Sequence, residues 1–241
     1  MISVCIATYN GEQNIKQQLE SILVQLDDED EVVVSDDGSS DETLNIISRF
    51  ADSRIRIFYH NKKNVSSRSA GHIYTAANFG NALRQVRGDY VFLADQDDIW
   101  VSGRVEKMKN ALADHLLVYC NFSVIDSKGD IIQENYFKVN PVSCSLFKNI
   151  LRMPFYGCCM AFRKELLNSV LPFPSKLLLH DNWIGMIALK RGKVFYIEEV
   201  LHLYRKHSNN VSGATGKSKN SLFYRLWYRA IFYFQIRKYL K

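Results

Sequence analysis

Short apolar runs alternate with segments of helical periodicity through the first hundred residues. Four runs have the length and composition of buried strands: Ile2–Ala7, Glu31–Ser35, Arg54–Tyr59 and Tyr90–Ala94. Apolar residues recur at helical spacing in the segments between them: Ile15–Leu26, Thr43–Phe50 and Thr75–Val86. Strands that alternate with helices in this way predict an α/β fold with a mostly parallel central sheet flanked by helices.

Polar residues gather where three of these strands end. The first strand runs into Thr8-Tyr9-Asn10, the second into Asp36-Asp37-Gly38-Ser39, and the fourth into Asp95-Gln96-Asp97-Asp98. Each motif alone also fits a turn or a helix cap. Together they favour a ligand site, because the carboxyl ends of parallel strands meet at one edge of a sheet.

The carboxylates of that edge constrain what the site binds. Unpaired, they repel each other by roughly 4 kcal/mol per close pair at an intermediate dielectric. A divalent cation relieves this repulsion, and oxygen ligands at this density suit Mg²⁺ or Mn²⁺.

Three motifs that are common in α/β enzymes are absent or incomplete in this sequence. The chain has no Gly-x-Gly and no Gly-x-Ser-x-Gly. Gly216-Lys217-Ser218 resembles the end of a P-loop, but Val211 stands where the first glycine of that motif belongs. A dinucleotide fingerprint, a P-loop and a serine nucleophile elbow are therefore not expected.

Charge divides the 241-residue chain into two parts. Of its 31 Lys and Arg, nine lie in residues 202–241, which contain no Asp or Glu, so residues 1–201 carry 22 basic and 25 acidic residues. The net charge of +6 thus belongs to the C-terminal part. A basic tail on an acidic body does not indicate nucleic acid, which is better matched by basic residues spread over a folded face.

The five cysteines are an odd number without a Cys-x-x-Cys pair, which favours a reduced protein. Cys158 and Cys159 are interpreted as packing residues, because no histidine lies at a suitable local spacing. The apolar start Ile2–Ala7 is too short for a signal core, and no stretch of about 18 apolar residues predicts a membrane span. A cytoplasmic protein is expected.

The last twenty residues predict an amphipathic helix. Phe223, Leu226, Trp227, Ala230, Ile231 and Phe234 recur at helical spacing, and Arg225, Arg229, Arg237, Lys238 and Lys241 add positive charge. This composition suits a helix that rests on an anionic membrane surface. Packing on the body, or a dimer contact, is the alternative.

Five motifs in order resemble the family 2 glycosyltransferases with the GT-A fold, whose central sheet is Rossmann-like. They are Thr8–Glu12, Ser35–Asp41, Gly88–Trp100, His180–Trp183 and Tyr204–Val211. The segment Ala-Asp-Gln-Asp-Asp-Ile-Trp is similar to a segment found in rhamnosyltransferase-like enzymes of bacterial surface polysaccharide synthesis. The resemblance covers residues 2 to about 213.

The resemblance implies a role for each motif. Nucleotide-sugar contacts fall on Thr8, Tyr9, Asn10, Glu12, Asp36, Asp37, Asp95, Arg205 and Lys206. Asp97 and His207 become ligands of Mn²⁺ or Mg²⁺, which stabilises the charge of the departing diphosphate. Asp181 becomes the general base that takes a proton from the acceptor hydroxyl, so that one displacement inverts the anomeric carbon. His180 and Trp183 then shape the acceptor side, although core packing explains both equally well.

The sequence therefore predicts a GT-A domain over residues 1–213, with a nucleotide-sugar half (about 1–100) and an acceptor half (about 101–213), followed by a basic tail (214–241). The expected reaction is transfer from a UDP- or dTDP-sugar to a glycan or polyprenyl-diphosphate-linked acceptor in O-antigen or capsule synthesis, at the inner face of the plasma membrane. The alternative is a non-enzymatic protein that binds membrane or nucleic acid through its tail. Residues 61–71 depart from the family pattern as a longer polar loop.

Overall fold

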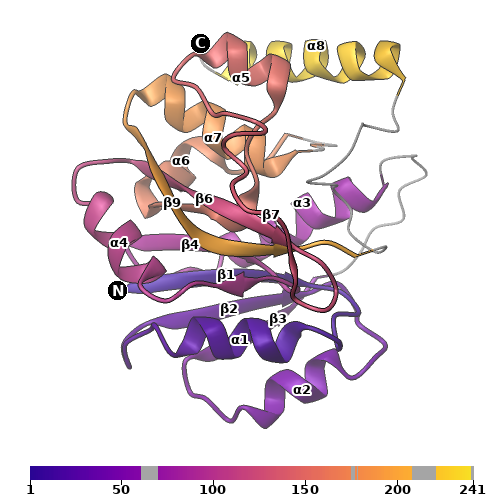
Figure 1. Cartoon of the computed structure of the whole chain (residues 1–241), viewed down its shortest axis with the longest axis vertical. Helices are drawn as coiled ribbons and strands as arrows, with labels where there is room; N and C mark the ends of the chain where they lie inside the picture. The colour runs from indigo at the N-terminus through magenta and orange to yellow at the C-terminus, as the bar shows by residue number, and fades with distance from the viewer. Residues whose placement is uncertain (61–69, 175–176, 178, 208–220, 240–241) are drawn as a thin grey trace.

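A computed structural model describes residues 1–60, 70–174, 177, 179–207 and 221–239. Two predicted features lie largely or wholly outside these ranges: the polar loop 61–71, of which only Ala70 and Gly71 are described, and the segment 208–220 with Gly216-Lys217-Ser218. The predicted α/β fold is confirmed, with helices on both sides of a central sheet (Figure 1).

The four strands predicted from the first hundred residues form the parallel half of the sheet. They are β1 (Ile2–Thr8), β2 (Glu31–Asp36), β3 (Ile55–Tyr59) and β4 (Tyr90–Asp95), each within one residue of its predicted bounds. Their order is β3-β2-β1-β4, with every pair parallel. The turns that follow β1, β2 and β4 therefore lie along one edge.

The second half of the sheet is mixed, which the strand-helix alternation did not predict. It contains β5 (Ile99–Trp100), β6 (Leu117–Ile125), β7 (Ile131–Gln133), β8 (Met160–Arg163) and β9 (Val194–Arg205). Over the described residues the order continues from β4 as β8-β6-β9-β5, with β7 on β6. β8 is antiparallel to β4 and β6, and β9 is parallel to β6.

Helices cover both faces of the sheet. α1 (Ile15–Leu23) and α2 (Thr43–Arg49) lie below it in Figure 1, while α3 (Ala70–Leu83), α6 (Leu167–Val170) and α7 (His180–Arg191) lie above. The remaining helical elements are α4 (Arg104–Ala111), α5 (Leu146–Arg152), α8 (Leu222–Tyr239), η1 (Gly157–Cys159) and η2 (Lys164–Leu166). α3 begins five residues before the predicted start at Thr75.

α8 packs on the body of the protein. Phe232 and Ile236 are buried, and the Phe232 ring meets Trp183 of α7 edge-on, with 6.3 Å between ring centroids. The alternative of body packing, left open by the sequence, therefore holds for one face of this helix. Among the helices of the described ranges, none has both the length and the hydropathy that a bilayer span requires.

A buried carboxylate holds the N-terminal ends of the parallel strands. Glu31 accepts hydrogen bonds from the Ser3 hydroxyl at 2.6 Å and the Arg87 backbone N–H at 2.7 Å, and it pairs with Arg56. Gly88 is needed here, since a Cβ would lie 2.7 Å from the Met1 backbone oxygen. Burial raises the pKa of Glu31, but these hydrogen bonds and Arg56 outweigh it, and the net pKa is lowered.

We predict that Glu31→Gln lowers the free energy of unfolding by about 1–3 kcal/mol at pH 7, because the charge-assisted hydrogen bonds are lost. A lowered pKa stabilises the fold above the unfolded-state pKa of about 4.3, and this stabilisation disappears as the pH falls through the folded-state pKa. Urea unfolding at decreasing pH should show the gap between wild type and variant closing. Glu29→Gln, at an exposed position, is the control; equal stability of both variants at pH 7 contradicts the assignment.

Candidate active site

The turn after β2 is organised by Asp36. Its carboxylate accepts hydrogen bonds from the Thr8 hydroxyl at 2.9 Å and from the Gly38 and Ser39 backbone N–H groups at 2.9 and 2.8 Å. Thr8 and Asp36 are both about 1% exposed. The structure therefore brings these two predicted residues together, and their polar groups are engaged in shaping the edge.

The turn after β1 is fixed against the turn after β2. Asn10 adopts a positive φ of 48°, and its side-chain oxygen accepts a hydrogen bond from the Ser40 N–H at 2.9 Å. The Glu12 carboxylate accepts one from the Glu42 N–H, also at 2.9 Å, at the start of α2. Asn10 and Glu12, which the sequence predicted to contact the nucleotide, thus also join the turn after β1 to the turn after β2.

Tyr9 and Asp37 present groups at the same edge. Tyr9 is 48% exposed, and its backbone N–H and C=O are bridged by the Gln96 side chain at 2.9 and 3.1 Å. Asp37 is 6% exposed and lies 2.5 Å from Nδ1 of His60, the residue that follows β3. The aromatic face of Tyr9 is suited to a planar group such as a nucleobase, whereas the Asp37 carboxylate is held by His60.

The acidic loop after β4 lies in a low-dielectric environment. Burial and the charges of Asp98 and Asp97 raise the pKa of Asp95 well above its usual range. Burial also raises the pKa of Asp97, although His207 Nε2 lies 2.7 Å from its carboxylate and opposes that change. The hydrogen bond that the His207 ring donates to the Asp97 carboxylate in turn raises the pKa of His207. The predicted ligand pair Asp97 and His207 is therefore in direct contact.

Asp98 lies beneath the loop and is fully buried. Its two carboxylate oxygens lie 2.9 Å from Nε2 of His202 and 2.8 Å from the backbone N–H of Arg205, both on β9. Neither the Asp98 nor the His202 side chain is exposed. This cluster joins the end of β4 to the end of β9.

Arg205 requires a correction. The sequence predicted a nucleotide-sugar contact, but the residue is 4% exposed, and its guanidinium donates to the Asp97 carbonyl at 3.0 Å and the Gln17 side chain at 2.7 Å. Its guanidinium holds the acidic loop in place. Lys206, the residue after the end of β9, is exposed.

Asp181 stands in the first turn of α7. Its carboxylate accepts hydrogen bonds from the Asn182 N–H at 2.7 Å and the Asn182 side chain at 3.1 Å. Burial raises the pKa of Asp181 despite these bonds, and its charge contributes to the raised pKa of Asp95. The predicted base and the acidic loop therefore lie within electrostatic reach of each other.

Trp183 also requires a correction, and His180 lies largely in the core. Trp183 is completely buried and its indole N–H donates to the Val170 carbonyl at 3.1 Å, so its ring has no face to offer a sugar. His180 is 8% exposed and stacks on Phe79, with ring centroids 4.5 Å apart. Burial lowers the pKa of His180 to about 3, which keeps the imidazole neutral.

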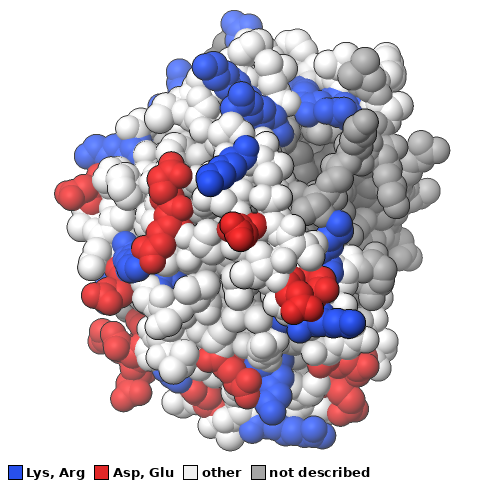
Figure 2. Space-filling model, viewed as in Figure 1, with Lys and Arg blue, Asp and Glu red and all other residues white. Residues whose placement is uncertain are grey.

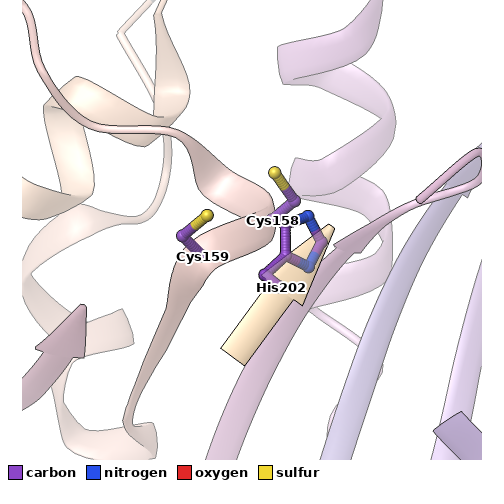
Figure 3. A group of neighbouring side chains, drawn as sticks. All are labelled: Cys158, Cys159 and His202. Atoms are coloured by element: carbon purple, nitrogen blue, oxygen red, sulfur yellow. The ribbon is translucent and has the colours of Figure 1, made fainter. Parts of the chain in front are cut away.

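Behind the acidic loop, Cys158 and Cys159 lie beside His202 (Figure 3), and ligand atoms of the three residues fall within 4.8 Å of one another. The sequence offered no such histidine because His202 is distant along the chain. Nε2 of His202 already faces Asp98. Burial raises the pKa of both thiols well above the usual range, which disfavours the thiolate that binds soft metals. We therefore retain the packing interpretation.

The donor set of the acidic loop fits a hard divalent cation. Asp95 and Asp97 have pKa values raised by burial and by neighbouring carboxylates, so a positive charge here removes a real electrostatic cost. Carboxylate oxygens with one imidazole suit Mg²⁺ or Mn²⁺.

Sequence reasoning missed three supporting residues: Gln96, His60 and His202. Gln96 lies inside a recognised motif and is half-buried, and its position between acidic residues was its local signal. His60 and His202 carry no local signal, because each acts on a carboxylate from another strand.

We predict that Asp98→Asn destabilises the protein by about 2–4 kcal/mol, since it removes the charge that holds His202 and the Arg205 N–H in a buried site. Urea unfolding at pH 7 measures the change. Asp114→Asn, on an exposed turn, serves as the control. A loss for Asp98→Asn no larger than the control's shows that the buried cluster does not hold the strand ends.

The sequence matches known glycosyltransferases. The family model Glycosyl transferase family 2 matches residues 3–171. The chain is 31% identical over 224 residues to dTDP-rhamnosyl transferase RfbG of Shigella flexneri, covering 87% of the chain and 74% of RfbG. It is 26% identical over 216 residues to an uncharacterized glycosyltransferase of Rickettsia typhi, covering 86% of the chain and 64% of that relative.

The fold matches solved structures of the same kind. S. aureus TarS 1-349 in complex with UDP-GlcNAc superposes with a TM-score of 0.69 and 20% identity, over 95% of this chain and 65% of TarS. The mannosyltransferase PcManGT of Pyrobaculum calidifontis, in complex with GDP-Man and Mn²⁺, gives a TM-score of 0.63 and 21% identity, over 87% and 58% of the two chains. The fold is that of the GT-A glycosyltransferases, and the chain belongs to glycosyl transferase family 2.

Proposed function

We propose that this chain is an inverting, metal-dependent glycosyltransferase that transfers a sugar from a UDP- or dTDP-sugar to a hydroxyl of a glycan or polyprenyl-diphosphate-linked acceptor. The observation that carries the proposal is the position of Asp181 beside the end of β4: a Cβ at Gly157 would lie 3.6 Å from both the Asp181 Cβ and the Leu93 Cδ1. In line with this position, the charge of Asp181 raises the pKa of Asp95 in the acidic loop. A base for the acceptor and a loop suited to the donor diphosphate thus lie in one site, as a single displacement requires.

Different residues of the chain would bind the donor, accept the proton and hold the cation. Tyr9 and Asp37 bind the nucleobase, and Thr8, Asn10 and Asp36 keep their loops in the binding shape. Asp181 takes the proton from the acceptor hydroxyl as the oxygen attacks the anomeric carbon opposite the diphosphate. Its raised pKa makes it a stronger base than an exposed aspartate. Asp97 and His207 would hold a divalent cation, which would supply charge stabilisation to the departing diphosphate.

The relatives support a role in bacterial surface polysaccharide synthesis, such as O-antigen or capsule. RfbG is a dTDP-rhamnosyl transferase, and a Campylobacter jejuni relative, 27% identical over 223 residues, is a glucosyltransferase named for an undecaprenol-linked acceptor. We further propose that the reaction takes place in the cytoplasm at the inner face of the plasma membrane. All five cysteines are free, which fits a reducing compartment.

The function is tested with purified protein, a panel of labelled UDP-, dTDP- and GDP-sugars, a polyprenyl-linked acceptor, and Mn²⁺ or Mg²⁺. We predict transfer from one UDP- or dTDP-sugar, its loss on chelation, and a fall on the order of a hundredfold in Asp97→Asn. Transfer that survives both chelation and this substitution rejects the metal assignment. Absence of both transfer and donor hydrolysis favours the non-enzymatic alternative.

We predict that Asp181→Asn lowers kcat on the order of a hundredfold or more while changing donor affinity little, because the general base is lost but the diphosphate site is kept. In the wild type, kcat should fall as the pH drops through the raised pKa of Asp181, since only the ionised carboxylate accepts a proton. Asp28→Asn, at an exposed position, is the matched control. Near-normal turnover in Asp181→Asn rules out this residue as the base.

A further inference from the structure

α8 carries two apolar faces, and only one of them is covered. Phe232 and Ile236, one turn apart, are buried against the body at 4% and 2% exposure. At 100° per residue, Phe223, Trp227 and Phe234 lie on the opposite side of the helix. They are 80%, 50% and 65% exposed. The apolar stripe recognised in the sequence is therefore the uncovered face.

α5 adds exposed apolar side chains at the same end of the molecule. It contacts α8, and both helices lie at the same end of the molecule (Figure 1). Phe147 and Leu151, one turn apart on α5, are 67% and 48% exposed, while Asn149 and Ile150 are buried. We define the α5–α8 face by six exposed side chains: Phe147, Leu151, Phe223, Leu226, Trp227 and Phe234.

The charge around this face has one sign. The sequence contains no Asp or Glu between Glu134 and Glu165, and none after residue 201. Lys148, Arg152 and Arg237 are exposed beside the apolar side chains. In Figure 2, the upper part of the visible surface, where α5 and α8 lie in Figure 1, is blue and white, whereas red side chains lie lower.

We propose that the α5–α8 face docks on the surface of an anionic lipid bilayer. Exposed aromatic and leucine side chains beside Lys and Arg match the boundary between acyl chains and anionic headgroups. A second copy fits less well, because a twofold contact brings the same cations together with no carboxylate between them. A nucleic acid would engage the cations but leave leucines without an apolar environment.

The proposed docking site thus includes two helices, whereas the sequence indicated the C-terminal helix alone and left open whether it packs on the body. Its purpose rests on the proposed lipid-linked acceptor, since a docked enzyme meets that acceptor in the plane of the membrane. Binding to lipid is nevertheless independent of catalysis, and the two can be measured apart.

Trp227 provides a direct signal for docking. The chain has three tryptophans, and the other two, Trp100 and Trp183, are 3% and 0% exposed. The full chain is titrated with vesicles of phosphatidylcholine mixed with phosphatidylserine, and with vesicles of phosphatidylcholine alone. We expect a blue shift of tryptophan emission with the anionic vesicles, weaker at high salt because screening reduces the attraction. No shift and no co-sedimentation with anionic vesicles overturns the proposal.

Variants locate the binding face. Phe223→Ser/Phe234→Ser and Phe147→Ser/Leu151→Ser should each weaken vesicle binding about tenfold, measured by co-sedimentation, since each removes two inserted side chains. Val24→Ser/Phe195→Ser is the matched control, because these side chains are 81% and 42% exposed and lie outside the face. Circular dichroism confirms folding. Wild-type binding by either face variant overturns the two-helix surface.

Three further measurements separate the alternatives. Sedimentation velocity without lipid should give the same oligomeric state for the wild type and for the Phe223→Ser/Phe234→Ser variant. If the wild type is a dimer that this variant loses, and the wild type does not bind vesicles, the face is a subunit interface. That result overturns the proposal. Single-stranded DNA that displaces the vesicles and itself shifts Trp227 emission also overturns it. Asp181→Asn should bind vesicles like the wild type, so that failure of docking and failure of catalysis are distinguishable.

Discussion

The buried carboxylate of Asp98 is the interaction on which the site depends. It joins the loop after β4 to β9 through His202 and the Arg205 N–H, across a pair of elements far apart in sequence. A carboxylate without water is stable only when its oxygens are hydrogen-bonded, so the loop and the strand end must keep this relation. Asp97 adjoins Asp98 and His207 follows Arg205 closely, so the same link brings Asp97 and His207 together.

The parallel half of the sheet supplies a second constraint. Register places the ends of β1, β2 and β4 side by side, and Asp36, Asn10 and Glu12 use their side chains to fix one loop on the next. Several residues predicted to contact the nucleotide therefore accept hydrogen bonds from the loops around them. This preorganisation means that a nucleotide meets loops already held in shape.

Burial also sets the electrostatic character of the site. Asp95, Asp97 and Asp181 all have raised pKa values, with loss of solvation as the first cause in each case. For the acidic loop this is a cost that a cation removes. For Asp181 it is an increase in basicity, which suits the proposed role of this residue as the base.

The sequence by itself determined the parallel strands, the position of the polar residues at their ends and the apolar stripe of the last helix. Each of these is periodic over a few residues, and a local period fixes which side of a strand or helix a residue occupies. It also gave the motif order, from which the family and the GT-A fold followed.

Only the tertiary structure decided which polar residues are buried and hold the fold and which stay exposed. Arg205 and Lys206 are adjacent and chemically alike, yet one is buried on the acidic loop and the other is exposed. Trp183 lies in a helix that begins beside Asp181 but is covered by α8. His202 reaches Asp98 from another strand. Burial and pairing of this kind depend on elements distant in sequence, and no local pattern encodes them.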